Sequence, residues 1–561
     1  MTAPWRKARR RVAGIRPIRR GWLSASLIAL CLSPLGVSGI ALAQISPRTI
    51  ETEAERQRLG IERRNAPARQ SGPGVVAPPP APKLTFPAGG ATVTLTRIDF
   101  DASAFLSEAE LEGVRARYLG RTVDLAAIGT LVQAVNDLYA EKGQVTASAI
   151  LPPQKLDGGV LKVGLIEGRV GAVSVTGATR TLPFYLQSQI RSAPESIVDT
   201  PELNRQISIF NRLNEVQLRA QMRAGAAFGL TDLELAATEP VRSLAQISYD
   251  NQAVRSTGRY QGVLYLKQHG LLGIDDRLIF YGSRSRGSLL GSGSYSLPVS
   301  PWGTRLSLSY TRSAFHIVTG AIRDLRPEGL SESRTLTLSQ PVFATDAVLL
   351  QATGSVGSGL SRSKQLDIET AHSLYTKTTG GLTLNLNTPS VTSASTASWG
   401  WVEYNDKIAD IRRGFAVATG NTAGLLRIND DIYALVTGAW QYSRETQLPG
   451  DQIFQIGGPS TLRGYPIGAA FGNSGFYGQA ELHYALPDPL RTLEAFVFLD
   501  HGATYATNPR MMRATSLGAG LAWRPLDWAT LEGGIARPLE RVSASQRDHE
   551  LYFRLTLKKS I

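Results

Sequence analysis

The chain is poor in cysteine and in long apolar runs. Its 561 residues include one cysteine, Cys31, so the chain can form neither an intramolecular disulfide nor a cluster of thiolate metal ligands. Beyond residue 43 no stretch reaches the roughly 18 apolar residues of a membrane-spanning helix. This excludes an ordinary helical membrane protein, whereas 55 glycines and 42% hydrophobic residues suit strands with one lipid face and one aqueous face.

Motifs of common enzymes are also missing. The sequence has no Gly-x-x-x-x-Gly-Lys phosphate loop and no Gly-x-Ser-x-Gly nucleophile turn. The six histidines lack metal-ligand spacing, and we interpret each as an isolated barrel or loop residue: His269, His316, His372, His483, His501 and His549. Although His501 follows Asp500, neighbouring strand residues point to opposite faces. We therefore expect no enzyme, no cofactor and no metal site, which leaves an outer-membrane hydrolase as a weak alternative.

The first 43 residues have the parts of a secretory leader. Eight basic residues precede a short apolar core that runs from Trp22 to Leu32. After this core, Ala41-Leu42-Ala43 resembles a signal-peptidase cleavage site. We expect a signal peptide over residues 1–43. Its removal takes away eight basic and no acidic residues and lowers the formal charge from +14 to +6, so nucleic-acid binding loses its compositional support.

Residues 44–65 predict a polar helix. Ser46 can cap it, Pro47 suits its first position, and early glutamates with late arginines complement the helix dipole. The segment has too few apolar residues to pack in a core, so it is either a solvated arm or a helix in a water-filled lumen. The prolines of residues 66–90 predict an extended linker.

Residues 91–240 carry one order of elements twice. The first set is a strand at Val93 to Phe100, helices at Ser107 to Tyr118 and Leu125 to Lys142, and strands at Val145 to Leu151 and Val160 to Glu167. The second set is a strand at Val170 to Val175, helices at Leu182 to Arg191 and Pro201 to Leu213, and strands at Val216 to Ala224 and Leu230 to Ala237. We predict two α+β modules, at residues 91–168 and 169–240. One larger α+β domain is the alternative.

Residues 241–561 consist of short period-two segments. For example, Leu382, Leu384 and Leu386 alternate with polar residues, as in membrane-barrel strands. About 320 residues, at roughly 20 per strand with its connection, allow about 16 strands. The predicted fold is an all-β transmembrane barrel of about 16 antiparallel strands, preceded by two α+β modules and an N-terminal helix. A soluble β-sandwich is the alternative.

Two barrel segments form a candidate functional pair. Residues 457–465 place Arg463 between glycines, which predicts a loop that returns a cation into the pore. In residues 493–502, Asp500 alternates with leucine, valine and alanine and so faces the lumen. A lumen carboxylate and a looped-in arginine could form a charge-assisted, bidentate pair. An exposed surface-loop charge is the alternative reading of Arg463.

Four motifs resemble those of one family, the two-partner secretion transporters that include the haemolysin-activator and filamentous-haemagglutinin transporters. A module signature contains Tyr139, Gly143, Leu151 and Pro152, and a first barrel-strand motif contains Tyr249, Asp250 and Asn251. An inward loop motif contains Leu462, Arg463, Gly464 and Tyr465, and a partner strand motif contains Phe498, Asp500 and Gly502. The resemblance runs from the N-terminal helix to the last strand.

The resemblance implies a plug helix in the pore, two periplasmic POTRA modules and a 16-stranded barrel in the outer membrane. It implies that Arg463 pairs with Asp500 and that Tyr465 props the loop. The family captures an unfolded exoprotein in the periplasm and exports it without nucleotide hydrolysis, and some members also activate it. The chain departs from the family at its end, Lys558-Lys559-Ser560-Ile561, where an aromatic residue is common. Either the assembly machinery recognises Phe553 and the strand pattern instead, or it tolerates this tail.

Two other functions stay open at this point. A barrel-assembly insertase shares the modules, the arginine loop and the barrel, but usually has more modules. A passive porin would need neither modules nor a plug. The expected partners are a secreted exoprotein bound by the modules, outer-membrane lipid and the barrel-assembly machinery, with no nucleic acid, and we expect a monomer. The cargo could be an adhesin, a haemolysin or a toxin.

Overall fold

The structure is a computed structural model that describes residues 47–65, 74–76, 89, 91–191, 193–507, 509–542 and 546–560. The predicted signal peptide at residues 1–43 lies outside the described residues, as does most of the predicted linker at residues 66–90. Within these ranges no helix has the length and apolar character needed to cross a membrane.

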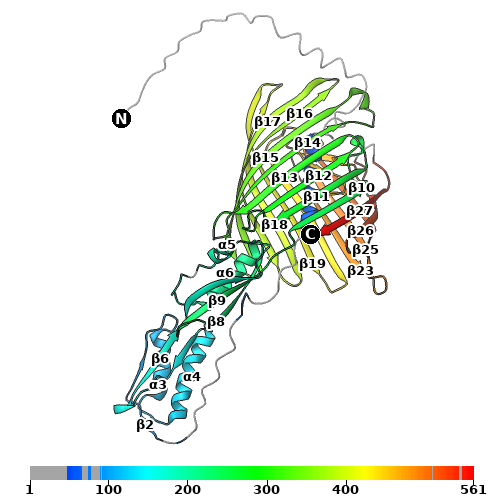
Figure 1. The fold of residues 1–561 in the computed structure, drawn as a ribbon. Helices are drawn as coiled ribbons and strands as arrows, with labels where there is room; N and C mark the ends of the chain where they lie inside the picture. Colours follow the sequence, from blue (N-terminus) through cyan, green and yellow to red (C-terminus); the bar gives the residue numbers. More distant parts are fainter. Residues whose placement is uncertain are drawn as a thin grey trace, which may run out of the picture. The chain divides into compact units, whose positions relative to one another are not determined.

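Sixteen antiparallel strands close into a barrel (Figure 1), which confirms the predicted fold class. Its first strands are β10 (Ser243–Asp250), β11 (Gln261–His269), β12 (Arg277–Ser285), β13 (Ser288–Pro298) and β14 (Arg305–His316). Five longer strands follow: β15 (Glu328–Ala344), β16 (Val348–Gln365), β17 (Ile368–Asn387), β18 (Val391–Asp406) and β19 (Ile411–Arg427). The rest are β20 (Ile432–Tyr442), β23 (Ser474–Ala485), β24 (Leu493–Tyr505), β25 (Met511–Leu526), β26 (Ala529–Pro538) and β27 (Glu550–Ser560).

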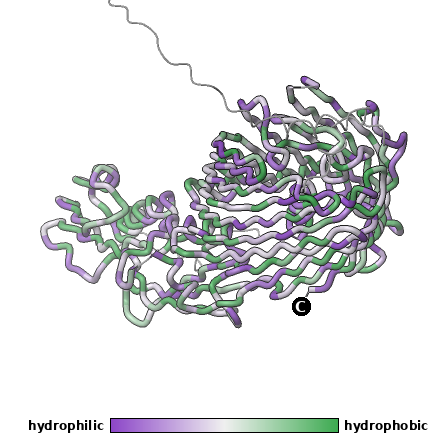
Figure 2. Tube along the Cα trace, turned by 90° about the horizontal axis from the view of Figure 1, so that it is seen from above, coloured by the Kyte–Doolittle hydropathy of each residue, from purple (hydrophilic) through white to green (hydrophobic). Residues whose placement is uncertain are grey.

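Period-two alternation separates the two faces of the barrel wall. On β24, Val497 and Leu499 are 54% and 52% exposed on the outer face, whereas Phe498 and Asp500 are 5% and 0% exposed on the inner face. Figure 2 shows the same alternation of hydrophobic and hydrophilic residues along neighbouring strands. Because strand side chains alternate, an apolar outer wall and a polar lumen arise from one pattern.

The first barrel strand pairs with the last and closes the wall. Seven residue pairs join β10 to β27, from Leu244 opposite Ser560 to Asp250 opposite Arg554. Arg554 Nε donates to Asp250 Oδ2 at 3.1 Å, and the side chain of Asn251 bonds to the backbone of β27 in both directions, at 2.9 and 3.1 Å. On the outer face Tyr249 stacks on Tyr260. The first barrel-strand motif thus lies at the closing seam.

The first module packs two helices on a small sheet. Its elements are β2 (Val93–Thr94), β3 (Arg97–Phe100), α3 (Glu108–Tyr118), β4 (Thr122–Val123), α4 (Leu125–Glu141), β5 (Ala147–Ile150) and β6 (Val160–Glu167). The sheet order is β3-β6-β5, and β2 pairs separately with β4. The prediction of one strand over Val93 to Phe100 is therefore wrong, because Leu95 and Thr96 turn away to bond to Gly120, Arg121 and Gly159. Buried Leu131, Val135 and Leu161 lie in the core.

The second module repeats this order and gains a strand from the linker. Its elements are β7 (Arg169–Thr176), α5 (Pro183–Ser188), α6 (Thr200–Leu213), β8 (Gln217–Ala224) and β9 (Leu230–Thr238). The sheet order is β1-β8-β9-β7, where β1 is Val75–Val76. Val75 and Val76 pair in parallel with Ala220 and Gln221. The described part of the predicted linker is therefore a short edge strand.

The N-terminal helix α2 (Pro47–Arg64) contacts inward-facing side chains of the barrel. Gln57 Oε1 accepts hydrogen bonds from Gln261 of β11 at 3.2 Å and Tyr281 of β12 at 3.1 Å. Glu51 accepts from Ser331 of β15 at 3.1 Å. Contacts with separate parts of the wall place the helix in the lumen. Its first turn holds no acidic residue, so the expected dipole role of the glutamates is wrong, whereas Arg63 and Arg64 lie in the last turn as predicted. Glu51 and Glu53 accept hydrogen bonds from Ser331 and Ser460 of the barrel instead.

Candidate functional site

The loop that carries the arginine motif folds into the lumen. It joins β20 to β23 and contains a small hairpin of β21 (Phe454–Ile456) and β22 (Ala470–Gly472). Gly457, Gly458 and Gly464 have φ values of 111°, 95° and 89°, which residues with a Cβ rarely adopt. A Cβ on Gly457 would lie 2.2 Å from the Pro466 carbonyl oxygen. The glycines therefore permit the tight turn that presents Arg463.

Arg463 is held by two carboxylates of the barrel wall. Its Nε donates to Asp500 Oδ2 at 2.8 Å, and its Nη2 donates to Asp500 Oδ1 at 2.6 Å. The backbone N–H of Arg463 also donates to Asp500 Oδ2 at 2.9 Å, while Nη1 donates to Glu481 Oε1 at 2.6 Å. Asp500 is fully buried. This bidentate, charge-assisted contact fixes both the position and the orientation of the guanidinium.

The other loop residues bond to the barrel wall. The Arg463 guanidinium lies 3.6 Å from the centre of the Phe498 ring, within cation–π range. The backbone N–H of Gly464 donates to the Tyr552 hydroxyl. The Tyr465 hydroxyl donates to the Thr515 carbonyl at 2.7 Å and to Glu540 at 3.1 Å, so it contacts two strand ends at once.

Close packing of Leu462 against Gly502 completes the motif. Leu462 is fully buried. A Cβ on Gly502 would lie 3.2 Å from the Leu462 side chain and 2.7 Å from the Phe476 carbonyl oxygen. Gly502 therefore leaves room on β24 for the loop to approach the wall.

The carboxylate chain extends beyond the predicted residues. His483 Nε2 lies 2.8 Å from Glu481 Oε2, and His483 Nδ1 lies 2.6 Å from Glu494 Oε1. Because ionised carboxylates only accept hydrogen bonds, both ring nitrogens donate and the ring is an imidazolium. Arg524 Nη2 completes the chain at 3.2 Å from Glu494 Oε2. The interpretation of His483 as an isolated residue is therefore wrong. The residues of this cluster have no regular spacing in the sequence that would have indicated it.

The plug helix contacts the arginine loop as well as the wall. Ser460 Oγ donates to Glu53 Oε1 at 2.7 Å, and Thr49 Oγ1 donates to Gln455 Oε1 at 2.9 Å. Arg56 lies over the Tyr477 ring, with its guanidinium carbon 5.3 Å from the ring centre. The helix and the loop that bears Arg463 thus share an interface inside the lumen.

The module signature residues lie at the core and at a turn of the first module. Tyr139 is 1% exposed and its hydroxyl donates to Glu167 at 3.1 Å. Burial raises the pKa of Tyr139 to about 12, so the hydroxyl keeps its proton. Gly143 (φ 70°) ends α4 and lies against Pro201 of the second module. Leu151 packs against the module core and Pro152 follows it. These four residues lie in the first module, apart from Arg463 and Asp500 in the barrel.

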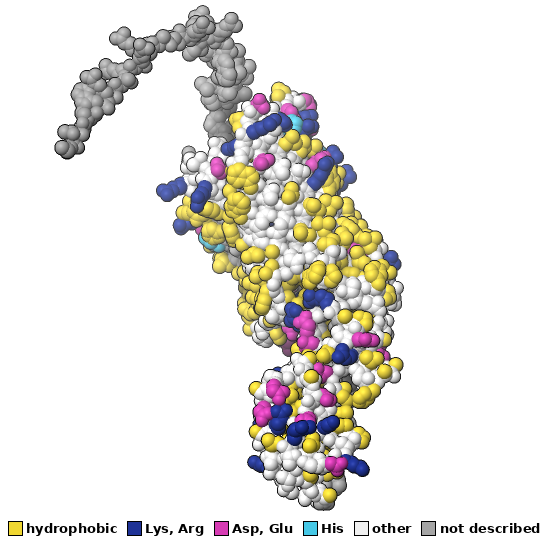
Figure 3. All heavy atoms as spheres, turned by 90° about the vertical axis from the view of Figure 1, so that its left-hand side faces the viewer, with side chains coloured by type: hydrophobic (Ala, Val, Ile, Leu, Met, Phe, Trp, Pro, Cys, Tyr) yellow, Lys and Arg dark blue, Asp and Glu magenta, His cyan; other side chains and the backbone are white. Residues whose placement is uncertain are grey.

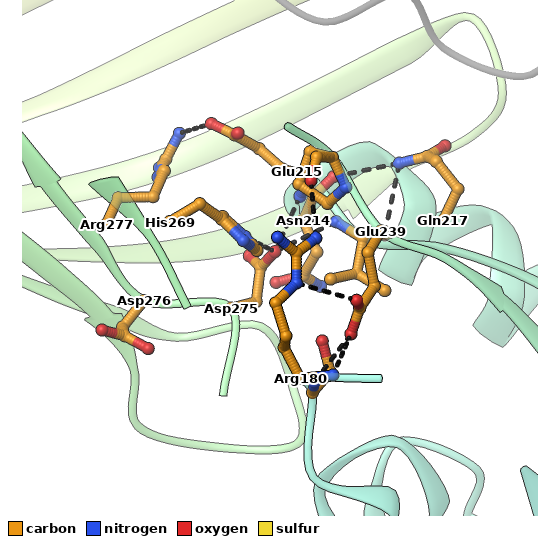
Figure 4. Close-up of polar contacts among 12 residues, drawn as sticks. Arg180, Asn214, Glu215, Gln217, Glu239, His269, Asp275, Asp276 and Arg277 are labelled. Carbon is orange, nitrogen blue, oxygen red and sulfur yellow. Dashed lines mark hydrogen bonds and ion pairs between the residues drawn. The ribbon is translucent and has the colours of Figure 1, made fainter. Parts of the chain in front are cut away.

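A polar joint connects the second module to the barrel (Figure 4). Asp275, in the turn between β11 and β12, is fully buried and accepts from the backbone N–H groups of Glu215 and Val216 at 3.0 and 3.1 Å. Arg305 Nη1 of β14 donates to Asp275 Oδ2 at 3.1 Å. His269 Nε2 lies 2.8 Å from Asp275 Oδ1, the oxygen that also accepts from the two backbone N–H groups. The interpretation of His269 as an isolated residue is therefore wrong.

Further contacts extend the joint. Lys267 Nζ donates to Glu215 at 2.6 Å, and Arg277 Nη1 donates to the same carboxylate at 3.2 Å. Within the second module, Glu239 accepts from the backbone N–H of Thr181 at 2.7 Å and from Arg180 Nε at 3.0 Å, which fixes the end of the module next to the joint. Burial acts to raise the pKa of Glu239, but the backbone donors lower it to about 2, so Glu239 is charged at neutral pH.

Metal binding has no support in the described ranges. No group of three or more His, Cys, Asp and Glu side chains within them is arranged to hold an ion. The charged clusters of the lumen and the joint pair cations with carboxylates.

The fold and the lumen site define a class: a transmembrane β-barrel preceded by two modules, with a plug helix and a carboxylate-bound arginine loop inside the pore. The family model described as haemolysin secretion/activation protein ShlB/FhaC/HecB matches residues 229–524, and the model of the ShlB-type POTRA domain matches residues 93–168. The chain belongs to the ShlB/FhaC/HecB family. It is therefore an outer-membrane transporter of the two-partner secretion class, and its modules lie in the periplasm.

Named relatives and solved structures are similar over most of the chain. The outer membrane transporter CdiB of Dickeya dadantii is 26% identical over 82% of this chain and 84% of its own length. The heme/hemopexin transporter protein HuxB of Haemophilus influenzae is 23% identical over 79% and 83%. The structure of CdiB from Escherichia coli has 19% identity and a TM-score of 0.67, covering 92% of this chain and 99% of its own.

Another solved structure has the same fold at lower similarity. BamA from Haemophilus ducreyi, in a structure lacking POTRA domains 1–3, gives a TM-score of 0.51 at 14% identity, over 84% of this chain and all of that one. At this identity the likeness concerns the fold alone.

Proposed function

We propose that this protein captures one specific exoprotein in the periplasm and passes it, unfolded, through its own barrel to the cell surface. The observation that carries the proposal is the shared interface of plug helix and arginine loop inside a closed barrel. Both obstructions are held by side-chain contacts and could leave the pore without unfolding the wall. No catalytic residue and no nucleotide are required.

The helix is suited to leave the lumen. Polar contacts to the wall are made by Glu51 and Gln57 of the helix and by Asn65 directly after it, and water can replace them once the helix is outside. The large apolar side chains of Ile50 and Ile61 are buried and would also become exposed. A typical hydrogen bond contributes only about 0.5–1.5 kcal/mol net, because water offers the same bond. A polar plug therefore closes the pore and still opens at modest cost.

Capture uses the edge of a module sheet. Strand addition supplies main-chain hydrogen bonds to an extended segment, and side-chain pockets supply selectivity. On β8 this edge is covered by Val75 and Val76, only two residue pairs. A longer segment of exoprotein would form more pairs along β8 and displace them. Since β1 lies between the plug helix and the modules in the sequence, displacement of β1 would release the chain that follows the helix from this attachment to β8.

Secretion tests the proposal. A candidate exoprotein, sought among the genes that flank this one, is followed in the culture medium for wild type, a gene deletion and an Asp500→Ala strain, while heat-modifiability reports on barrel folding. We expect the exoprotein to disappear from the medium in both mutants while other outer-membrane proteins stay at normal levels. General loss of outer-membrane proteins would instead assign the insertase function.

A further inference from the structure

Four exposed apolar side chains meet where the second module joins the barrel. Phe184 is 64% exposed and Leu182 is 40% exposed, both at the start of α5, whereas Leu271 and Leu272 are 50% and 56% exposed in the turn between β11 and β12. The Leu182 N–H donates to the Gly273 carbonyl at 2.9 Å. A Cβ on Gly273 would lie 2.9 Å from Leu182 Cγ, so the two segments touch. We call Leu182, Phe184, Leu271 and Leu272 the apolar edge.

Two consecutive aspartates organise this edge. Asp275 faces the module and bonds to the backbone of Glu215 and Val216. Asp276 points away from that cluster (Figure 4) and accepts from the backbone N–H groups of Leu271 and Leu272 at 3.1 and 2.9 Å. One aspartate holds the module while the next holds the turn that presents the leucines.

The apolar edge continues the lipid-facing wall. Strand β12 starts directly after the turn, and its outward Leu278 and Phe280 are 40% and 41% exposed. Opposite Leu278, Tyr295 of β13 donates its hydroxyl to Asp276 at 2.8 Å. Tyrosine and tryptophan gather where a membrane meets water, and Trp302, 63% exposed in the next module-side turn, fits the same level. Figure 3 shows hydrophobic side chains over much of one face of the barrel.

We propose that the apolar edge inserts into the periplasmic leaflet of the outer membrane and anchors the second module to the lipid surface. Large apolar side chains lose their unfavourable hydration when they enter the acyl boundary, and interfacial segments bind membranes through such residues. The occupant is phospholipid, because the edge is continuous with a wall that lipid already covers. The second module would then be held at a fixed distance from the membrane by two attachments, the polar joint and the apolar edge.

The test uses the full chain in vesicles of phosphatidylethanolamine and phosphatidylglycerol. The only native cysteine is replaced (Cys31→Ser), and a single probe site is made by Phe184→Cys or, as matched control, by Phe228→Cys. Phe228 lies in the β8–β9 turn of the same module and is 86% exposed. Each site carries a small fluorophore, which is quenched either by nitroxide-labelled lipid or by aqueous iodide.

We expect nitroxide lipid to quench the label at residue 184 at least two-fold more strongly than the label at residue 228, and iodide to show the reverse order. In a Leu271→Ser, Leu272→Ser background the lipid quenching at residue 184 should fall towards that of residue 228, with heat-modifiability unchanged. Equal quenching at both sites would overturn the proposal. If the serine variant stopped secretion while residue 184 showed no lipid contact, the edge would be a docking surface for exoprotein instead.

Discussion

At the residue scale, replacement of Arg463 by alanine should abolish secretion while the barrel still inserts. The change leaves Asp500, which is fully buried, and Glu481 without their shared cation, and an unpaired buried charge costs about 3–5 kcal/mol. The loop therefore leaves its bound position. Exoprotein in the medium, measured beside heat-modifiability of the barrel, checks the effect.

Arg491 supplies the control for that experiment. Its side chain is 61% exposed and lies 3.7 Å from Asp431 in the module-side turns, a geometry in which ion pairs contribute little. Arg491→Ala should secrete at the wild-type level. Normal secretion by the Arg463→Ala strain would remove the proposed role of the Arg463 and Asp500 pair.

His483 should matter for the same loop although it does not touch Arg463. Replacement by phenylalanine keeps the ring stacking on Tyr433 and Phe496 but removes both donors, so Glu481 and Glu494 repel each other. We expect a single cysteine at Ser460 to react with a soluble thiol reagent several-fold faster in His483→Phe than in the parent chain. His483→Gln, which keeps a donor, should give an intermediate rate, and equal rates in all three would show that the histidine does not position the loop.

Strand parity predicts the inward Asp500 and the resemblance predicts its partner, but neither predicts the extended carboxylate chain. Glu481, His483 and Glu494 lie on two strands, and only the register of β23 with β24 brings them together. Register depends on pairing along the whole wall. A search for ligand spacing along the sequence therefore misses contacts made across strands.

At the element scale, the strand formed by Val75 and Val76 should limit capture of exoprotein. Gly74→Val would place a Cβ 2.8 Å from Ile207 Cγ2 in the module core, so β1 can no longer lie on β8. In the parent chain β1 competes with the exoprotein for β8 and is held there by two or three hydrogen bonds, about 1–2 kcal/mol in all. Loss of this competition should strengthen exoprotein binding to β8 roughly five- to thirty-fold. Fluorescence anisotropy with the N-terminal segment of the exoprotein and the full-length transporter measures the change.

Val76→Thr is the matched control, because the Val76 side chain is 44% exposed and threonine keeps a strand conformation. Its affinity should equal that of the parent chain. Unchanged binding by Gly74→Val would direct capture to another edge, such as β5 or β7.

The longer helices and strands of the modules are largely predictable from the sequence, whereas the two-residue strands are not. Capping and periodicity identify α3, which Ser107 caps through a capping box, and α4, which Asp124 caps. Two-residue strands such as β1 and β2 have no period to detect. Their conformation depends on partners, β8 and β4, that are distant in sequence.

At the scale of the whole molecule, acid should loosen the joint between module and barrel. Although burial acts to raise the pKa of Asp275, its hydrogen bond with His269 and the charge of Arg305 lower this pKa below the usual 3.8. A lowered carboxyl pKa stabilises the joint above pH 3.8, and this contribution disappears as the pH falls through the lowered value.

Distance measurement between two spin labels checks this prediction. Labels at Phe228→Cys in the module and Ser390→Cys in the barrel, in the Cys31→Ser background, should give a narrow distribution at pH 7 that broadens below about pH 4. Asp275→Asn, which removes the carboxylate that accepts from the backbone of residues 215 and 216, should already give a broad distribution at pH 7. An unchanged distribution from pH 7 to pH 3 would mean that the joint does not depend on Asp275.

The sequence predicts the barrel as a whole because every strand repeats one alternation, and about sixteen such strands fit its length. It does not predict how the barrel meets the modules. That joint depends on Asp275, a residue with φ of 60° in a short turn, and on backbone donors from residues 215 and 216. Neither feature belongs to a periodic pattern.

The strands of the barrel differ in length, and this shapes the exit. Strand β17 has 20 residues and β11 has 9, so at about 3.4 Å per residue their lengths differ by roughly 35 Å. In Figure 1 β16 and β17 rise above the other strands, so the rim is oblique. A polypeptide that left the pore at this rim would therefore meet the long strands β16 and β17 on one side and no strand of that length on the other.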